Sequence, residues 1–169
     1  MAESSNQREG SGMQNSQTVE ASVKHPGTGR LASVLLFHDL ENTSPVSVAA
    51  GKYILLIASE RQVMPLGVKT ARAWVDAGAS YICAWGRDSA AVEETFDYAA
   101  FLPDCGDPLP FTLMTTSHRD KTPVEALWFA FYNARSPDDL KHELNTVVIV
   151  VDSEELWTTC TSWVKENNE

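Results

Sequence analysis

Ionisable and hydroxyl side chains follow the ends of four apolar segments of the sequence. They occur in Ser59–Glu60–Arg61, Trp85–Gly86–Arg87–Asp88, Thr115–Thr116–Ser117–His118 and Asp152–Ser153–Glu154–Glu155. An imidazole is a common general base in hydrolases, a serine hydroxyl is a common nucleophile, and a carboxylate often orients the imidazole. Glu60, His118 and Asp152 are therefore our candidates for a catalytic set. Ser59 or Ser117 would then supply the nucleophile.

Structural roles explain much of the same pattern. Ser117 and His118 are adjacent, so their side chains diverge, and the chain contains no Gly-x-Ser-x-Gly elbow. Ser153 suits the N-cap of a helix, and the acidic residues that follow it favour the positive end of the helix dipole. The alternative interpretation of His118 is a hydrogen bond to a backbone group in its loop.

Carboxylates at these segment ends could also bind magnesium. Glu60 with Asp152 and Glu154 would offer the hard oxygen ligands that suit phosphoryl transfer. This loosely resembles the Toprim arrangement, in which a glutamate after one strand faces an Asp-x-Asp pair after a later strand. Here the pair is Asp-x-Glu, and the glycine expected near the glutamate is missing. Because GxGxxG loops and P-loops are also missing, we expect neither a metal nor a nucleotide cofactor.

Tryptophan is unusually frequent, with five in the chain. Trp128 and Trp163 fall on the apolar stripes of predicted helices, where we expect them to face the core. Trp85 ends an apolar segment, and Trp157 lies beside the stripe of the last helix. Packing in the core or between helices is the favoured interpretation of both. Exposed aromatic side chains among acidic residues would instead be typical of a protein–protein hot spot. The residues that we predict for binding are Trp85, Asp88, Thr116, Ser117 and Trp157.

The charge distribution argues against a nucleic-acid partner. The formal net charge is −10, and residues 1–30 contain three basic and three acidic residues, so residues 31–169 carry all of it. A nucleic-acid binder needs a basic surface, whereas an acidic surface suits a basic protein partner. No apolar segment reaches the length of a membrane span. We therefore expect a cytoplasmic protein that contacts neither nucleic acid nor membrane.

Residues 1–30 differ in composition from the rest of the chain. They are rich in Ser, Gln, Gly and Asn and contain no Phe, Tyr or Trp. Such a segment buries too little apolar surface to offset the entropy of ordering it, which predicts a disordered tail. Residues 31–169 are numerous enough to form one domain with a full core.

Apolar segments of strand length alternate with helical patterns along residues 31–169. Strands are predicted at 31–37, 52–59, 80–86, 146–151 and in the segment that begins at Phe111. Helices are predicted at 64–78, 88–101, 136–144 and 152–166, and after Thr122. Thr122–Pro123–Val124–Glu125 has the pattern of a capping box with proline in the first turn.

This alternation predicts a three-layer α/β sandwich. Its mainly parallel, Rossmann-like or flavodoxin-like sheet would contain about five strands, with helices on both faces. Only 14 residues without a helical stripe separate 31–37 from 52–59. We therefore expect 31–37 to be an antiparallel edge strand or a separate addition. Ligands of open parallel sheets bind beyond the carboxyl ends of the strands, where the four polar segments lie.

Three short segments resemble a known group of proteins. They are MTTSH (114–118), EALWF (125–129) and YICAWG (81–86). The group consists of small bacterial proteins that share a domain of unknown function, and the similarity extends from about Tyr53 to the C-terminus. The resemblance implies a compact α/β domain and assigns no catalytic residue.

Two functional hypotheses remain at this point, and they leave open whether the protein is an enzyme. The first is an acidic α/β domain that binds a basic protein as an accessory or regulatory partner, in the manner of an immunity protein or antitoxin. The second is a hydrolase or a metal-dependent phosphoryl-transfer enzyme with its site at the carboxyl ends of the strands.

Overall fold

The computed structural model describes residues 18–19, 23–40, 45, 49–61, 66–140 and 142–166. Its strands are β1 (Thr18–Val19), β2 (Val23–Lys24), β3 (Leu31–Leu36), β4 (Tyr53–Ala58), β5 (Ala79–Trp85), β6 (Met114–His118) and β7 (Thr146–Val151). Its helices are α1 (Val68–Asp76), α2 (Ser89–Phe101), the short 3-10 helix η1 (Pro103–Cys105), α3 (Pro123–Tyr132) and α4 (Glu154–Glu166).

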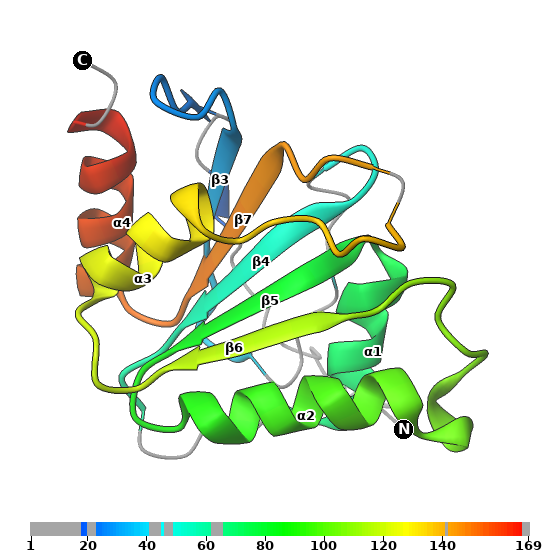
Figure 1. The fold of residues 1–169 in the computed structure, drawn as a ribbon. Helices are drawn as coiled ribbons and strands as arrows, with labels where there is room; N and C mark the ends of the chain where they lie inside the picture. Colours follow the sequence, from blue (N-terminus) through cyan, green and yellow to red (C-terminus); the bar gives the residue numbers. More distant parts are fainter. Residues whose placement is uncertain are drawn as a thin grey trace, which may run out of the picture.

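The strands form one mixed, mostly parallel sheet. Its order is β1-β3-β7-β4-β5-β6, and β2 also pairs with β3. The five strands from β3 to β6 in this order are parallel, whereas β1 and β2 are antiparallel to β3. Helices α1 and α2 cover one face and α3 and α4 cover the other (Figure 1). The predicted three-layer α/β sandwich with a mainly parallel sheet is confirmed.

Strand β4 shows why the apolar segments are continuous rather than alternating. Leu55 and Ile57 belong to the core beneath α1 and α2, whereas Leu56 and Ala58 belong to the core beneath α3 and α4. A strand covered on both faces needs an apolar residue at every position. Each fully buried large aliphatic side chain contributes about 1.5–3 kcal/mol relative to an exposed one.

The expectation for residues 31–37 was wrong. β3 pairs in parallel with β7, from Leu31 opposite Thr146 to Leu36 opposite Val151. The described residues of the connection between β3 and β4 supply apolar packing. Leu40 is buried in the core beneath α1 and α2, and Ala49 packs against that core. The length of the connection indicated neither this packing nor the insertion of β7 between β3 and β4.

The helix predicted at 136–144 is also wrong. In the described part of this segment, the Leu140 amide donates to the Pro137 carbonyl in a turn, and Ser136 Oγ donates to the His142 carbonyl instead of capping a helix. The Asp139 carboxylate accepts hydrogen bonds from the amide and hydroxyl of Thr112, at 2.7 and 2.8 Å. These contacts hold the segment beside the start of β6. The helix predicted at 64–78 is α1, and residues 64–65 of the predicted range lie outside the described residues.

Helix α3 begins as the sequence predicts. Thr122 Oγ1 accepts from the Glu125 amide at 3.2 Å, and the Glu125 carboxylate accepts from the Thr122 amide at 2.7 Å, which completes the capping box. The inward orientation predicted for Trp128 is wrong, since that side chain is 50% exposed. The buried face of α3 consists of Ala126, Leu127, Ala130 and Phe131. Trp128 lies beside this face rather than on it.

Residues before Leu31 belong to the folded domain. His25 is fully buried, with ring centroids 4.8 Å from Phe131 and 5.6 Å from Trp163. The Arg30 guanidinium donates to three carbonyl groups at the end of α3, at 2.6–2.8 Å, where a cation complements the helix dipole. The domain therefore begins before the predicted boundary at residue 31. Most of the predicted tail lies outside the described residues.

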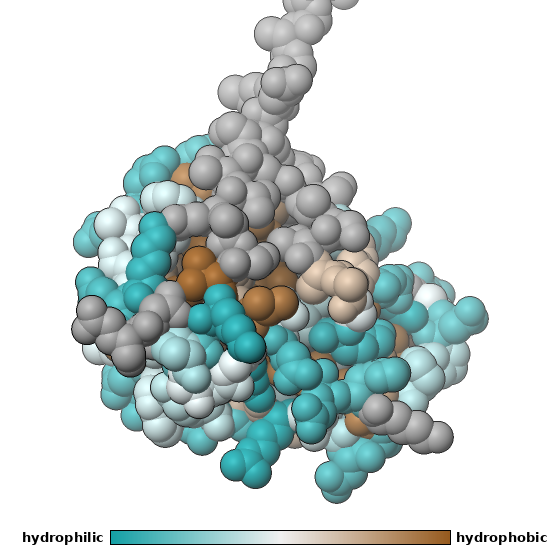
Figure 2. Space-filling view, turned by 90° about the horizontal axis from the view of Figure 1, so that it is seen from above, coloured by the Kyte–Doolittle hydropathy of each residue, from teal (hydrophilic) through white to brown (hydrophobic). Residues whose placement is uncertain are grey.

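Polar residues dominate the surface seen in Figure 2. Hydrophilic residues make up most of the coloured atoms on this side, and a few hydrophobic residues gather near the centre of the view. Within the described residues, none of the helices combines the length and the apolar character that crossing a bilayer requires.

The buried imidazole of His25 should make the stability of the domain depend on pH. Burial lowers the pKa of His25 from its ordinary value of 6.5. Because the fold favours neutral His25, the stability present above about pH 6.5 is lost as the pH falls through the folded-state pKa. We expect the free energy of unfolding in urea to fall between pH 7.5 and 5.5, and to fall less in His25→Phe. Exposed His142→Phe is the control, and an equal fall in the wild type and His25→Phe would contradict the prediction.

Candidate functional site

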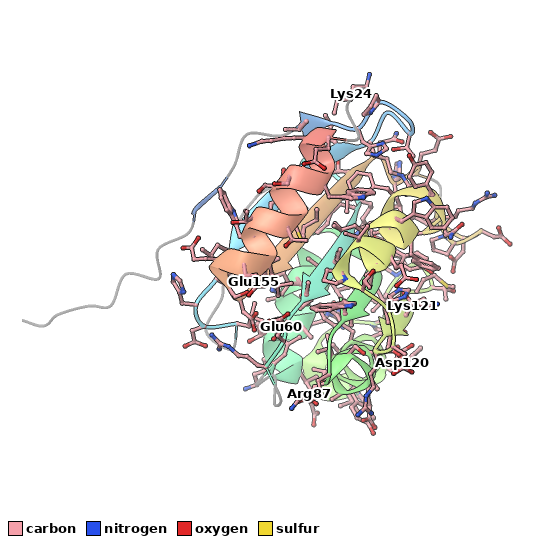
Figure 3. All side chains as sticks on the ribbon, turned by 90° about the vertical axis from the view of Figure 1, so that its left-hand side faces the viewer. Lys24, Glu60, Arg87, Asp120, Lys121 and Glu155 are labelled. Carbon is pink, nitrogen blue, oxygen red and sulfur yellow. The ribbon has the colours of Figure 1, made fainter. Side chains whose placement is uncertain are left out.

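The carboxyl ends of the parallel strands lie along one edge of the sheet, as predicted. Glu60, Arg87 and Asp120 project there from the loops after β4, β5 and β6, and Glu155 lies in the first turn of α4 (Figure 3). Three of the four polar segments identified in the sequence therefore lie at this edge. Of the fourth, only His118 does, because Thr115, Thr116 and Ser117 lie within β6 rather than after it. Strand order decides which of them are neighbours.

Ser59, Arg61 and Asp152 form a cluster across the ends of β4 and β7. Ser59 Oγ donates a hydrogen bond to Asp152 Oδ2, and Arg61 Nε lies 3.3 Å from the same oxygen. Ser59 is fully buried and Asp152 is nearly so. The Arg61 guanidinium also donates to the carbonyl of His38, just after β3, at 2.7 Å. Asp152 is thus a buried carboxylate with partners. Its loss would leave the Ser59 hydroxyl hydrogen without an acceptor, at a cost of about 1–3 kcal/mol, although Ser59 Oγ would still accept from the Arg61 amide.

The ends of β4 and β5 approach closely at Gly86. This glycine has φ +117°, and a Cβ atom there would lie 1.8 Å from the Ser59 carbonyl oxygen. Trp85 is buried, and its indole nitrogen donates to the Lys121 carbonyl at 2.7 Å. The loop after β6 is therefore attached to the end of β5.

His118 ends the edge strand β6 and is partly buried. Its Nε2 lies 3.2 Å from Thr116 Oγ1, and its ring centroid is 4.6 Å from that of Phe129. Burial lowers the pKa of His118, the Glu93 carboxylate opposes this effect, and Lys121 adds to it. A neutral imidazole at pH 7 has the protonation state of a general base.

The three candidate catalytic residues stand on separate strand ends. Glu60 follows β4, His118 ends β6, and β5 lies between these strands. With about 4.8 Å between neighbouring strands, the strand of His118 is about 10 Å from that of Glu60 and about 14 Å from that of Asp152. Asp152 contacts Ser59 and Arg61, and His118 contacts Thr116 and Phe129. Among the described residues, the three side chains do not form one hydrogen-bonded set.

The candidate binding residues are distributed along the same edge and on α4. Asp88 is the N-cap residue of α2 but makes no capping hydrogen bond with its side chain, and Ser117 is exposed. Thr116 Oγ1 donates to the Ile82 carbonyl at 3.3 Å. Trp85 is buried and Trp157 packs against the core beneath α3 and α4, so both have the packed position that the sequence favoured over an exposed one.

A pocket of about 540 Å³ opens at this edge. It is lined by Glu60, Trp85, Gly86, Arg87, Arg119 and Asp120. Its two carboxylates and two guanidinium groups could bind a small polar ligand that carries charge. Within the described residues, no three His, Cys, Asp or Glu side chains converge in a way that would hold a metal ion.

A second surface escaped the sequence interpretation. Tyr98, Phe101 and Leu102 at the end of α2 are exposed large side chains, and Phe101 is 78% exposed. They lie within residues 88–118, which contain six acidic residues and no Lys or Arg. This stretch of negative charge without a basic residue is the feature of the sequence that could have indicated the surface. We call the surface formed by Glu94, Tyr98, Phe101, Leu102 and Asp104 the acidic–aromatic face.

The fold and the polar strand ends define a doubly wound α/β domain with open loops at the carboxyl edge of its sheet. The chain belongs to the family described as a domain of unknown function, DUF7684, whose model matches residues 33–167. The predicted resemblance to a family of this kind is confirmed, and a bacterial origin stays a prediction. The chain has no match among the curated proteins.

Two glycines with positive φ should respond differently to substitution. Gly86→Ala adds both backbone strain and a clash with the Ser59 carbonyl, so we expect it to lower the free energy of unfolding by about 3 kcal/mol or more. Gly51 has φ +95° with no atom within 4 Å of its would-be Cβ, so Gly51→Ala should cost about 1 kcal/mol from strain alone. Urea denaturation measures both values. Equal losses would contradict the packing described for Gly86.

Proposed function

We propose that this domain is an accessory protein that binds a basic protein partner through the acidic–aromatic face. The observation that carries the proposal is the 78% exposure of Phe101 within a stretch of 31 residues, 88–118, that contains no Lys or Arg. An aromatic anchor surrounded by charge of one sign is a combination that protein–protein interfaces use.

The side chains of this face are arranged along one side of α2. Glu94 and Tyr98 are one helical turn apart, and the Tyr98 hydroxyl donates to the Glu94 carboxylate at 2.9 Å. Phe101 and Leu102 follow at the end of the helix, and exposed Asp104 lies in η1. The face thus presents carboxylates beside apolar surface. Residues 88–118 contribute no Lys or Arg that could pair with these carboxylates. Such a surface attracts a cationic partner over several ångströms and repels an anionic one.

The arrangement of the carboxyl edge also supports a binding role over catalysis. Asp152 is held by Ser59 and Arg61, and a whole strand separates Glu60 from His118. An immunity protein or antitoxin needs no catalytic set, and it typically recognises a basic toxin by charge and shape. We infer this class of role from the acidic–aromatic face.

Loss of Phe101 should weaken partner binding selectively. Tagged wild type, Phe101→Ser and Trp128→Ser would each be used to capture proteins from native lysate at 50 and 500 mM salt. A protein retained by the wild type at low salt only would be identified, purified and titrated against all three. We expect a basic partner whose Kd rises at least tenfold with Phe101→Ser and is unchanged with Trp128→Ser, the matched exposed aromatic on α3. Equal effects of both variants, or recovery of the domain alone at every salt concentration, would count against the proposal.

The second candidate function is a hydrolase or metal-dependent phosphoryl-transfer enzyme at the carboxyl edge. The observation in its favour is the pocket of about 540 Å³ in which Arg87 and Arg119 accompany Glu60. Guanidinium groups bind phosphate well, and a carboxylate can hold a metal or a proton.

Thermal unfolding with divalent metals and a nucleotide panel separates the two functions. Because we propose a binding protein, we expect none of these ligands to raise the Tm of the wild type. A rise in Tm that is lost in both Glu60→Ala and His118→Ala, and kept in the exposed control Glu155→Ala, would favour the enzyme instead.

A further inference from the structure

A groove of about 680 Å³ lies between the end of α2 and the loop that leads to β6. Leu102, Leu109 and Phe111 contribute apolar surface to it, together with prolines 103, 108 and 110, and Phe101 also lines it. The groove therefore adjoins the acidic–aromatic face. Its size is in the range of cavities that hold a small ligand or a few side chains.

Contacts on both sides keep the groove open before any ligand binds. Buried Arg72 pairs with Asp76 at 2.9 Å and donates to the carbonyl groups of Ala99 at 3.3 Å and Asp107 at 2.7 Å, which joins α1, α2 and the loop. On the other side, the carboxylate of Asp139 accepts both hydrogen bonds from Thr112. A preformed site loses less entropy when it binds than a flexible one does.

The charges around the groove are mainly negative. Asp104, Asp107 and Asp139 are exposed. Among the described residues, the cations nearby include Arg72, which pairs with Asp76, and Lys52, whose ammonium lies 4.6 Å from the centre of the Phe111 ring. Exposed Arg135 lines a neighbouring pocket that shares Thr112 and Asp139 with the groove. An apolar groove with an acidic rim complements an apolar side chain that has cationic neighbours.

We infer that this groove binds an apolar anchor residue, such as Leu or Phe, in a Lys- or Arg-rich segment of the partner protein. The inference rests on the proposed function and adds the recognition element. Carboxylates on the rim would bind the flanking cations, while the groove would select the anchor by burying it. The carboxylates would then attract any basic segment, and the groove would make binding tighter for segments that carry an apolar anchor.

Defined peptides provide the test on the full chain. The probes are acetylated and amidated nonapeptides of the form KSKSXSKSK with Ala, Leu or Phe at X, and an acidic series ESESXSESE. Binding would be followed by NMR titration of the ¹⁵N-labelled protein, which gives both the affinity and the location. We expect the Leu and Phe peptides to bind about tenfold more tightly than the Ala peptide, with shifts concentrated in residues 100–113. The acidic series should not bind.

Two variants separate the anchor from the charge. Leu102→Ser should remove the preference for Leu over Ala, whereas Leu31→Ser should keep it, since both leucines are 43% exposed and only Leu102 lines the groove. Asp104→Lys should weaken all basic peptides by a similar factor and keep the preference.

The outcomes distinguish the inference from the proposed function. Salt-sensitive binding of the basic series with equal affinities for Ala, Leu and Phe overturns the groove as the anchor site and leaves the acidic–aromatic face as a charge-based interface. Binding that maps to α3 also overturns the groove. Failure of every basic peptide to bind at 25 mM salt, or equal binding of the acidic series, overturns both.

Discussion

Parallel pairing of β4 with β7 on one side and β5 on the other is the constraint on which the rest of the structure depends. Helices cover both faces of β4, and its residues Tyr53–Ala58 are at most 2% exposed. Polar side chains are therefore excluded from this strand and appear directly after it, at Ser59 and Glu60. Since all five parallel strands end at the same edge, their polar residues gather there by geometry, whether or not they perform chemistry.

The domain uses much of that edge for its own stability. Ser59 and Asp152 connect the ends of β4 and β7, and the Trp85 indole holds the loop after β6. A buried carboxylate that is engaged by two partners has little freedom to turn toward a substrate. The groups at the edge that remain available to a ligand are the exposed side chains of the pocket, Glu60 and Arg87 among them.

Local patterns in the sequence predicted most of the strands and helices. They did not predict which strands pair with one another, because pairing depends on long-range contacts. Continuous apolar segments identified the strands, and the capping box at Thr122 located the start of α3. The position of β7 between β3 and β4 could not be predicted, because strand order depends on contacts between residues about 100 positions apart. For the same reason, the separation of Glu60 from His118 could not be predicted. No sequence pattern indicated that β5 would lie between their strands. Residues 136–144 have a helical pattern because Pro137 and the acidic residues after it suit a first turn. In the described part of this segment, Asp139 binds Thr112 instead.

The fold alone does not account for the acidic–aromatic face. Six carboxylates in residues 88–118 repel one another, and an exposed Phe101 contributes nothing to the core of the domain. Neither feature is required by α2, whose inward face of Val92, Phe96 and Ala99 already packs the helix on the sheet. A basic partner would relieve the repulsion and cover the aromatic ring in the same step. A partner that buried the ring would also bring its own side chains against the neighbouring carboxylates. Because Phe101 and Leu102 line the groove as well, the charge of the face and the apolar groove would act on the same segment of that partner.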